Sequence, residues 1–259
     1  MRITSVAFIW LITSTVTPAL RTTLTTIALL TILTSQAVAD FNKGIAAFFD
    51  NNWVIAVSEL EPHALNGNPV AQTALGNIYS TGGNGIEQDE EKAFIFYQLA
   101  AEQGMSNAQY NLAAAYSVGR GVAQNFSKTE YWYSKCGEQE PTADAVTPVL
   151  CRHFLGNMYY QGDEIAQNYK KAMFWFKKAS EFKSQDSMAN VGIMYANGEG
   201  VMQDYVLAHM WFNLASSLGS DNGKKYRNML SEDMSVSDVS KAQELARLCI
   251  KNSYKECDY

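Results

Sequence analysis

Two short motifs carry the residue types of covalent catalysis by serine. The stretch "SEFK" places Lys183 three positions after Ser180, and "SDN" follows at 220–222. A serine nucleophile that opens β-lactams needs this pair of motifs and a third motif, K-T-G, on a strand. The chain contains no K-T-G and shows no strand pattern. We therefore assign no catalytic residue, and a penicillin-interactive hydrolase is kept only as an alternative function.

Cysteine and histidine also stand close together in "CRH", where His153 follows Cys151 by two positions. A thiolate beside an imidazole can act as a nucleophile, but a cysteine in a disulfide cannot attack. His209 is adjacent to Met210 and Trp211 on an expected helix, so we interpret it as a surface or packing residue. There is no tight Cys-x-x-Cys pair of the kind that binds zinc. The sequence thus predicts neither a metal nor a cofactor.

An internal repeat accounts for most of the remaining pattern. Glutamine followed by Asp or Asn recurs at a nearly regular interval, with the second residue at Asp89, Asn125, Asn168 and Asp204, and the spacings are 36, 43 and 36 residues. A side-chain oxygen at such a position caps the first free N–H groups of a helix. We therefore expect a helix to begin directly after each anchor.

Small and aromatic residues follow each anchor at fixed offsets of four, seven, eight and eleven. These offsets share one stripe of an α-helix. The expected packing residues at offsets four, seven and eleven are Ala93, Phe96, Ala100, Trp132, Ala172, Trp175, Ala179, Ala208, Trp211 and Ala215. Small residues let helices approach closely and rings fill the gaps between them, so each unit should stack on its neighbours.

A second helix precedes each anchor and ends at glycine. It carries Leu75, Leu112, Leu155 or Val191, each followed four residues later by tyrosine. Between the two helices stand Gly82, Gly119, Gly162 and Gly198, with further glycines near three of them. Glycine adopts positive φ at little cost, so it stops a helix and turns the chain. A phosphate-binding glycine loop would instead follow a strand, and none is expected.

The repeating phrases "YANGEGVMQDYVLAHMWFNLASSLG" and "YSVGRGVAQNFSKTEYWYSKCGEQ" resemble Sel1-like repeats, which are relatives of tetratricopeptide repeats. The resemblance implies an all-α fold, a right-handed α-solenoid of stacked helix-turn-helix hairpins. The expected organisation is a secretory signal peptide at 1–39, a degenerate repeat at 40–67, repeats at 68–104, 105–147 with an insertion, 148–183 and 184–219, and capping helices at 220–259. Glu164, Glu140 and Lys183 depart from the pattern by replacing glycine.

The first 39 residues have the composition of an export signal. Arg21 precedes the apolar run "TTLTTIALLTILTS", and the small residues of "AVA" place a cleavage site between Ala39 and Asp40. An uncleaved membrane anchor is the alternative. No cysteine follows the junction, so no lipid anchor is expected, and the predicted location is the periplasm or the exterior.

Four cysteines, Cys136, Cys151, Cys249 and Cys257, allow three pairings. Cys136 and Cys151 occupy small-residue positions that face each other between consecutive repeats, and cysteine-rich members of the family have bridges at matching positions. Pairing Cys249 with Cys257 requires the last helix to stop near Asn252, because eight helical residues span about 12 Å. Free or cross-paired thiols stay open.

The function implied by the resemblance is non-catalytic binding of a protein or extended peptide in the groove of the solenoid. The formal net charge is −6, and it becomes more negative if residues 1–39 are removed, since their only charges are Arg2 and Arg21. Without clustered basic residues, nucleic acid is not an expected partner, nor is a membrane once the signal is removed. The alternative within the same class is a structural component of an envelope machine, such as a flagellar motor or polysaccharide secretion apparatus.

Overall fold

The computed structural model describes residues 41–142 and 146–257, so the expected signal segment and its Ala39–Asp40 junction lie outside the described residues. The chain divides into two compact units, residues 1–88 and 89–259, and each is described by itself. Within the described ranges the fold is all-α, with one isolated β-bridge between Gly83 and Ile86 and no strand. None of the described helices is long and apolar enough to cross a membrane.

The first unit holds a helix at residues 41–49, α3 (Trp53–Leu65) and α4 (Pro69–Thr81). α3 packs on α4 through Ala56, Leu60 and Ala64, which are all buried. Asn68 caps α4 by accepting hydrogen bonds from two backbone N–H groups of its first turn. The segment expected to be a degenerate repeat therefore contributes two helices, of which α3 packs on α4.

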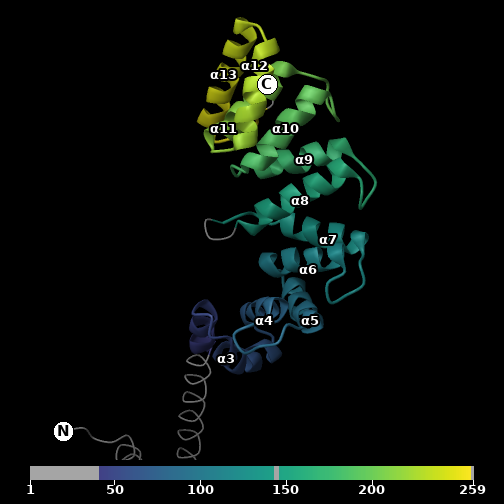
Figure 1. Ribbon diagram of the computed structural model, residues 1–259, viewed down its shortest axis with the longest axis vertical. Helices are drawn as coiled ribbons and strands as arrows, with labels where there is room; N and C mark the ends of the chain where they lie inside the picture. The colour runs from purple at the N-terminus through teal and green to yellow at the C-terminus, as the bar shows by residue number, and fades with distance from the viewer. Residues whose placement is uncertain (1–40, 143–145, 258–259) are drawn as a thin grey trace, which may run out of the picture. The chain divides into compact units, whose positions relative to one another are not determined.

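The second unit is a series of helices that pack in chain order (Figure 1). They are α5 (Glu90–Glu102), α6 (Ser106–Val118), α7 (Phe126–Gly137), α8 (Thr147–Gln161), α9 (Tyr169–Ser180), α10 (Gln185–Asn197), α11 (Tyr205–Ser217), α12 (Asp221–Asp233) and α13 (Val236–Lys251). α13 also returns to pack on α11. Stacked hairpins of this kind form an α-solenoid.

The anchor residues cap the second helix of each hairpin. Asp89, Asn125, Asn168 and Asp204 each accept a hydrogen bond from the backbone N–H three residues on, at 2.9 to 3.0 Å. This confirms the predicted role of the anchors. The glutamine before each anchor has its own task, because its side-chain amide donates to a carbonyl in the last turn of the preceding helix. The glutamine and the Asp or Asn that follows it thus fix the two ends of the turn.

Glycine ends the first helices, as the sequence predicts. Gly119, Gly162 and Gly198 are the C-caps of α6, α8 and α10, and all three are in the left-handed conformation. A second kind of glycine lies in the middle of a helix. A Cβ at Gly192 would come within 2.6 Å of the Phe212 ring, so the absent side chain makes room for that ring.

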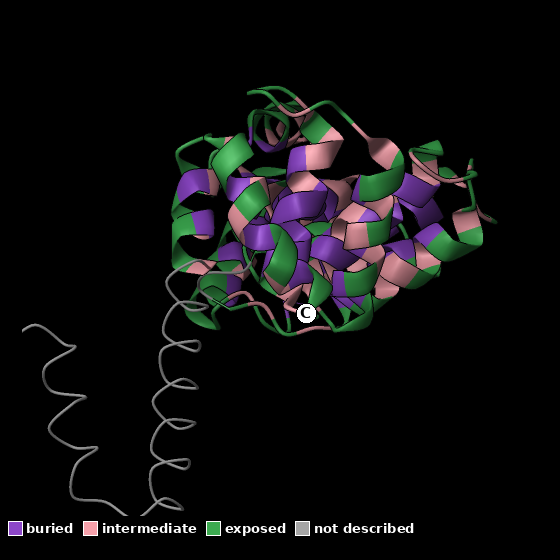
Figure 2. Ribbon diagram, turned by 90° about the horizontal axis from the view of Figure 1, so that it is seen from below, coloured by how far each residue is buried: buried purple, intermediate pink, exposed green. Residues whose placement is uncertain are grey.

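Buried positions recur on every helix and form the interior between neighbouring helices (Figure 2). The C-terminal helices close the series, and Ser235 is the N-cap of α13. Ser235 accepts from the backbone N–H of Asp238 at 3.1 Å and donates to its carboxylate at 2.8 Å. α12 lies close to α11, because a Cβ at Gly223 would be 2.7 Å from that of Ala215.

Candidate binding surface

The first helices of successive hairpins contact one another in a row within the second unit. α6 contacts α8, α8 contacts α10, and α10 contacts α12. Side chains three or four residues apart on each helix point to the same side of it. We call the shared side of these helices the first-helix surface. The residues that define it are Tyr110, Ala114, Ser117, Phe154, Asn157, Gln161, Asn190, Ile193 and Asn197.

Two cavities of about 420 Å³ each open on the first-helix surface. One lies over α6 and α8, with Tyr133 of α7 at its side and Glu164 of the following turn at its edge. We call it the aromatic cavity. The other lies over α10, α11 and α12, and it is bordered by Phe212, Tyr226 and Leu230. Both cavities fall within the 300–1,000 Å³ that small-ligand and side-chain pockets commonly occupy.

Three rings form one wall of the aromatic cavity. Tyr133 and Phe154 stack with ring centroids 5.6 Å apart and planes 8° from parallel. Tyr110 is tilted against both, with its centroid 5.7 Å from each of theirs. Burial, helped by Tyr110 and Glu164, raises the pKa of Tyr133 far above its usual value, so its hydroxyl stays neutral. The wall is thus a rigid, uncharged aromatic face.

Between the two cavities lies a ladder of polar side chains from α8 and α10. Asn190 donates to the Asn157 amide oxygen at 3.2 Å, and the Asn157 amide nitrogen is 3.0 Å from His153 Nε2. His153 Nδ1 is 2.8 Å from the Ser187 hydroxyl oxygen. Both ring nitrogens of His153 therefore have a polar partner.

The Ser187–His153–Asn157 group has the residue types of a hydrolytic triad but not its geometry. Ser187 is fully buried, and its hydroxyl also accepts a hydrogen bond from the Ser184 hydroxyl at 2.9 Å. A nucleophile has to reach its substrate, and this hydroxyl is closed off from solvent. Burial also lowers the pKa of His153, partly opposed by Asp186, and this keeps the ring neutral. The group therefore holds α8 to α10, and it leaves asparagine amides along the surface.

The residue two positions after the C-cap glycine differs among the turns, and in one turn it is a glutamate that borders the aromatic cavity. In two turns glycine packs against the preceding second helix: a Cβ at Gly121 would lie 2.0 Å from the Glu90 carbonyl oxygen, and one at Gly200 would lie 2.8 Å from Tyr169. Glu164 holds the same position in the repeat between them. Its carboxylate accepts from Ser117 on α6 at 3.2 Å and borders the cavity. Burial, helped by a neighbouring turn acid, Glu199, raises the pKa of Tyr160 to about 12.

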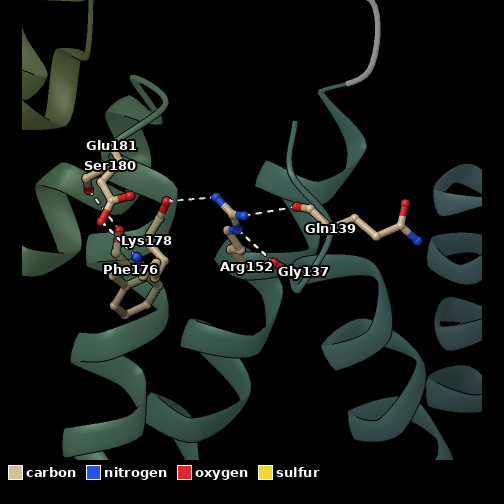
Figure 3. A network of polar contacts seen from close by, with 7 residues as sticks. All are labelled: Gly137, Gln139, Arg152, Phe176, Lys178, Ser180 and Glu181. Carbon is tan, nitrogen blue, oxygen red and sulfur yellow. Dashed lines mark hydrogen bonds and ion pairs between the residues drawn. The ribbon is translucent and has the colours of Figure 1, made fainter. Parts of the chain in front are cut away.

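Arg152 of α8 joins the C-terminal ends of α7 and α9 (Figure 3). Its guanidinium donates to the carbonyl oxygens of Gly137 at 2.7 Å, Gln139 at 3.0 Å and Lys178 at 3.2 Å. It also lies over the Phe182 ring, 4.9 Å from the centroid. The side chain is buried, and burial lowers its pKa, partly offset by Glu140 and Glu181. Helix C-terminal carbonyls carry partial negative charge, so they suit a cation.

The burial of the expected packing residues depends on their offset from the anchor. The alanines Ala93, Ala100, Ala172, Ala179, Ala208 and Ala215 are all buried. Of the offset-seven rings, only Trp211 is buried, whereas Phe96, Trp132 and Trp175 are half-buried. The ring buried in all four repeats is at offset eight, and these rings are Tyr97, Tyr133, Phe176 and Phe212. In two hairpins this ring faces a mid-helix glycine of the first helix, because a Cβ at Gly156 would be 2.4 Å from Phe176 and one at Gly192 would be 2.6 Å from Phe212.

The four cysteines form two pairs. Cys136 is bonded to Cys151 across the α7–α8 junction, with their Cα atoms 5.9 Å apart. Cys249 is bonded to Cys257, and α13 ends at Lys251 with Asn252 as its C-cap, so the tail folds back. All four cysteines are buried.

The residues of the enzyme-like motifs have structural roles. Ser180 is fully buried and donates to the Phe176 carbonyl, while Lys183 lies over the Tyr254 ring. Ser220 caps α12 by accepting from the Gly223 N–H. His209 is buried and bonds the Ser231 hydroxyl, so it is a packing residue. In the described ranges, no three His, Cys, Asp or Glu side chains are grouped as metal ligands.

Sequence reasoning missed Arg152, the His153 ladder and the aromatic cavity. Aligning the repeats could have pointed to Arg152, because Gln72 and Gln109 occupy the same position in their repeats. Their side chains donate to the carbonyls of Ala64 and Ala101. Arg152 Nε contacts Gly137, which matches Ala101. The ladder and the cavity join residues of different repeats at positions that vary, so the repeat pattern does not mark them.

Comparison with known proteins supports this reading of the chain. A Sel1 repeat family model matches residues 69–105, 106–139, 149–181 and 185–220. The crystal structure of a Sel1 repeat protein from Oxalobacter formigenes is similar, with TM-score 0.65 and 28% identity over 72% of this chain and 74% of that one.

Similar curated proteins include the chitin synthase regulator SKT5 of Saccharomyces cerevisiae, 35% identical over 30% of this chain and 11% of its own length. Another is protein sel-1 homolog 2 of Rattus norvegicus, 31% identical over 38% of this chain and 15% of its own. The chain therefore spans only a small part of these relatives. Four matched repeats that cover more than half of the chain, on a series of capped helical hairpins, show that the protein belongs to the Sel1 repeat family.

Proposed function

We propose that the protein is an exported, non-catalytic scaffold that binds an extended segment of a partner protein on its first-helix surface. Sel1 repeats typically mediate protein–protein interaction, and the observation that carries the proposal here is the surface itself. Two cavities lie along it, and the amides of Asn157 and Asn190 lie on the helices between them. Amide side chains can donate to and accept from a peptide backbone, while cavities take its side chains.

The proposal of export rests on the cysteines and the first 39 residues. Two buried disulfides are typical of oxidising compartments such as the bacterial periplasm. N-terminal sequencing of the protein purified from its source cells tests this directly. We expect the mature chain to begin at Asp40 and to be released with the periplasmic fraction. A chain that retains residues 1–39 and needs detergent for extraction would contradict it.

Partner binding is tested by cross-linking in intact cells, followed by purification and mass spectrometry. Asn190→Arg places a long charged side chain on the first-helix surface, and we expect it to lose the cross-linked partner. Ser127→Arg is the matched control, because Ser127 is exposed at the start of a second helix, α7. Both variants should keep the wild-type melting temperature within a few degrees.

If the wild type enriches no partner, or if Asn190→Arg keeps it, the proposed function is wrong. A partner recovered at fixed stoichiometry within a large envelope complex would instead identify the protein as a structural component of that assembly.

A further inference from the structure

The aromatic cavity combines a ring wall with a carboxylate at one edge. Tyr110, Tyr133 and Phe154 supply the rings, and Glu164 supplies the charge. Ring faces carry negative electrostatic potential, so they attract cations, and a nearby carboxylate adds to that attraction. A planar guanidinium satisfies both, because it stacks on aromatic faces and can donate two parallel bonds to one carboxylate.

We propose that the aromatic cavity is the recognition pocket for one arginine side chain of the partner segment. The inference rests on the proposed function and names the partner's chemistry at one point of the surface. The guanidinium stacks against the ring wall and donates to the Glu164 carboxylate, while Asn157 and Gln161 line the same cavity with polar atoms. The cavity volume of about 420 Å³ is ample for this side chain.

Charge on the rest of the molecule favours the same occupant. The formal net charge is −6, so a basic segment is attracted over a distance, whereas an acidic one is repelled. Arg120 is the one basic residue that borders the aromatic cavity. Its side chain is more than half exposed and is 3.9 Å from Glu90, so solvent and that carboxylate screen its charge.

Glu164 is specific to this turn. The matching positions in the turns on either side are Gly121 and Gly200, where backbone of the preceding helix leaves no room for a side chain. The other cavity has Asp233 at its edge but is lined mainly by apolar side chains, among them Phe212, Met229 and Leu230. The arginine pocket therefore occurs once along the described first-helix surface, and it sets the register in which a partner segment would bind.

The test is a titration of the ¹⁵N-labelled full chain with N-acetyl-arginine-N-methylamide, followed by backbone chemical shifts. The lysine, norleucine and glutamate analogues are the comparison probes. We expect saturable shifts around Ser117, Phe154 and Glu164 for the arginine probe. Lysine should bind more weakly, and norleucine and glutamate should show no saturation. Added salt should weaken the arginine binding.

Glu164→Gln should weaken the arginine probe about tenfold, because a charge-assisted bond becomes a neutral one. Asp163→Asn is the matched control, since it removes the same charge from the adjacent exposed residue of the same turn. It should leave the affinity unchanged. Unchanged amide spectra away from the turn establish that both variants fold.

Equal binding of norleucine and arginine would overturn the inference in favour of an apolar pocket. Equal losses in the two variants would overturn it in favour of a diffuse charge effect, and so would shifts located elsewhere. The probe titration needs no partner, so its outcome is separate from that of the cross-linking experiment. A partner that cross-links normally to Glu164→Gln would leave the scaffold function standing and remove the arginine pocket.

Discussion

The α7–α8 and α9–α10 junctions perform the same task with different chemistry. At each one, the chain leaves a second helix and enters the first helix of the next repeat. At the α7–α8 junction an insertion lengthens the loop, a disulfide joins its ends, and the Arg152 guanidinium binds three carbonyls. At the α9–α10 junction the turn is short, Met188 takes the place of Arg152, and Lys183 adopts a left-handed φ of 63°.

We infer that the lengthened loop is compensated locally. At the short α9–α10 turn an apolar residue suffices at the start of the next helix, and at the short α5–α6 turn Gln109 donates to one carbonyl of the preceding helix. At the lengthened α7–α8 loop the buried Arg152 guanidinium donates to three carbonyls. We therefore expect substitution of Arg152 to change the stability of the protein most, and substitution of the left-handed Lys183 to change it least.

The largest effect is expected for Arg152→Ala. It leaves three carbonyl acceptors and a cavity beneath the surface, so the free energy of unfolding should fall by about 3–4 kcal/mol. Arg152→Gln should lose roughly half as much, because glutamine holds one carbonyl at the matching position of other repeats. Guanidinium denaturation measures both variants. Equal losses would show that the amide cannot substitute, and a negligible loss for alanine would break the comparison between the junctions.

Removing the Cys136–Cys151 disulfide comes next. The double variant Cys136→Ala/Cys151→Ala should lower the free energy of unfolding by about 3 kcal/mol, as expected for a closed loop of 15 residues. The Cys249→Ala/Cys257→Ala variant is the control at the tail, where the closed loop spans 8 residues. Its loss should be slightly smaller, about 2.5 kcal/mol. A much larger loss at the tail would mean that the C-terminal cap, not the junction, limits stability.

Acidification should destabilise the fold through two histidines, His153 on α8 and His209 on α11. Burial lowers the pKa of His153 and of His209 below the unfolded value near 6.5, with Arg227 adding to the effect at His209. Each group then binds more protons when unfolded than when folded. The stability they contribute is complete above pH 6.5 and is lost as the pH falls through the lowered values. Denaturation midpoints measured from pH 7.5 to 5 should decline, and His153→Gln should reduce the slope.

The smallest effect is expected for Lys183→Gly. Gly67, Gly104 and Gly219 hold the matching place with φ between 88° and 98°. A left-handed non-glycine residue costs about 1–2 kcal/mol, and glycine's greater unfolded freedom offsets about 0.5–1 kcal/mol of the gain. The net change should be a stabilisation of about 0.5 kcal/mol. Lys183→Ala retains the backbone strain, so a gain there of equal size would show that the lysine side chain, not φ, is responsible.

The sequence predicted the features that depend on neighbours along the chain. Asp204 caps its own helix, Gly198 stops the preceding one, and both follow from local geometry. The sequence placed offsets seven and eight on one stripe but did not show that offset eight would be the more buried, because that depends on which side of the second helix faces the first. The aromatic cavity combines Tyr110, Phe154 and Glu164 from two repeats, and its carboxylate comes from one glycine replaced by glutamate. Such contacts require the packing angle between hairpins, which the repeat period does not contain.

The disulfide across the α7–α8 junction has a consequence for chain cleavage. Any peptide bond cut between Cys136 and Cys151 leaves two fragments that share one covalent link, since the bridge encloses the inserted loop. The nicked protein would migrate as one species without reductant and as two with it. A protease could therefore cut this loop without releasing either half, and the stacked helices on both sides would remain a single molecule.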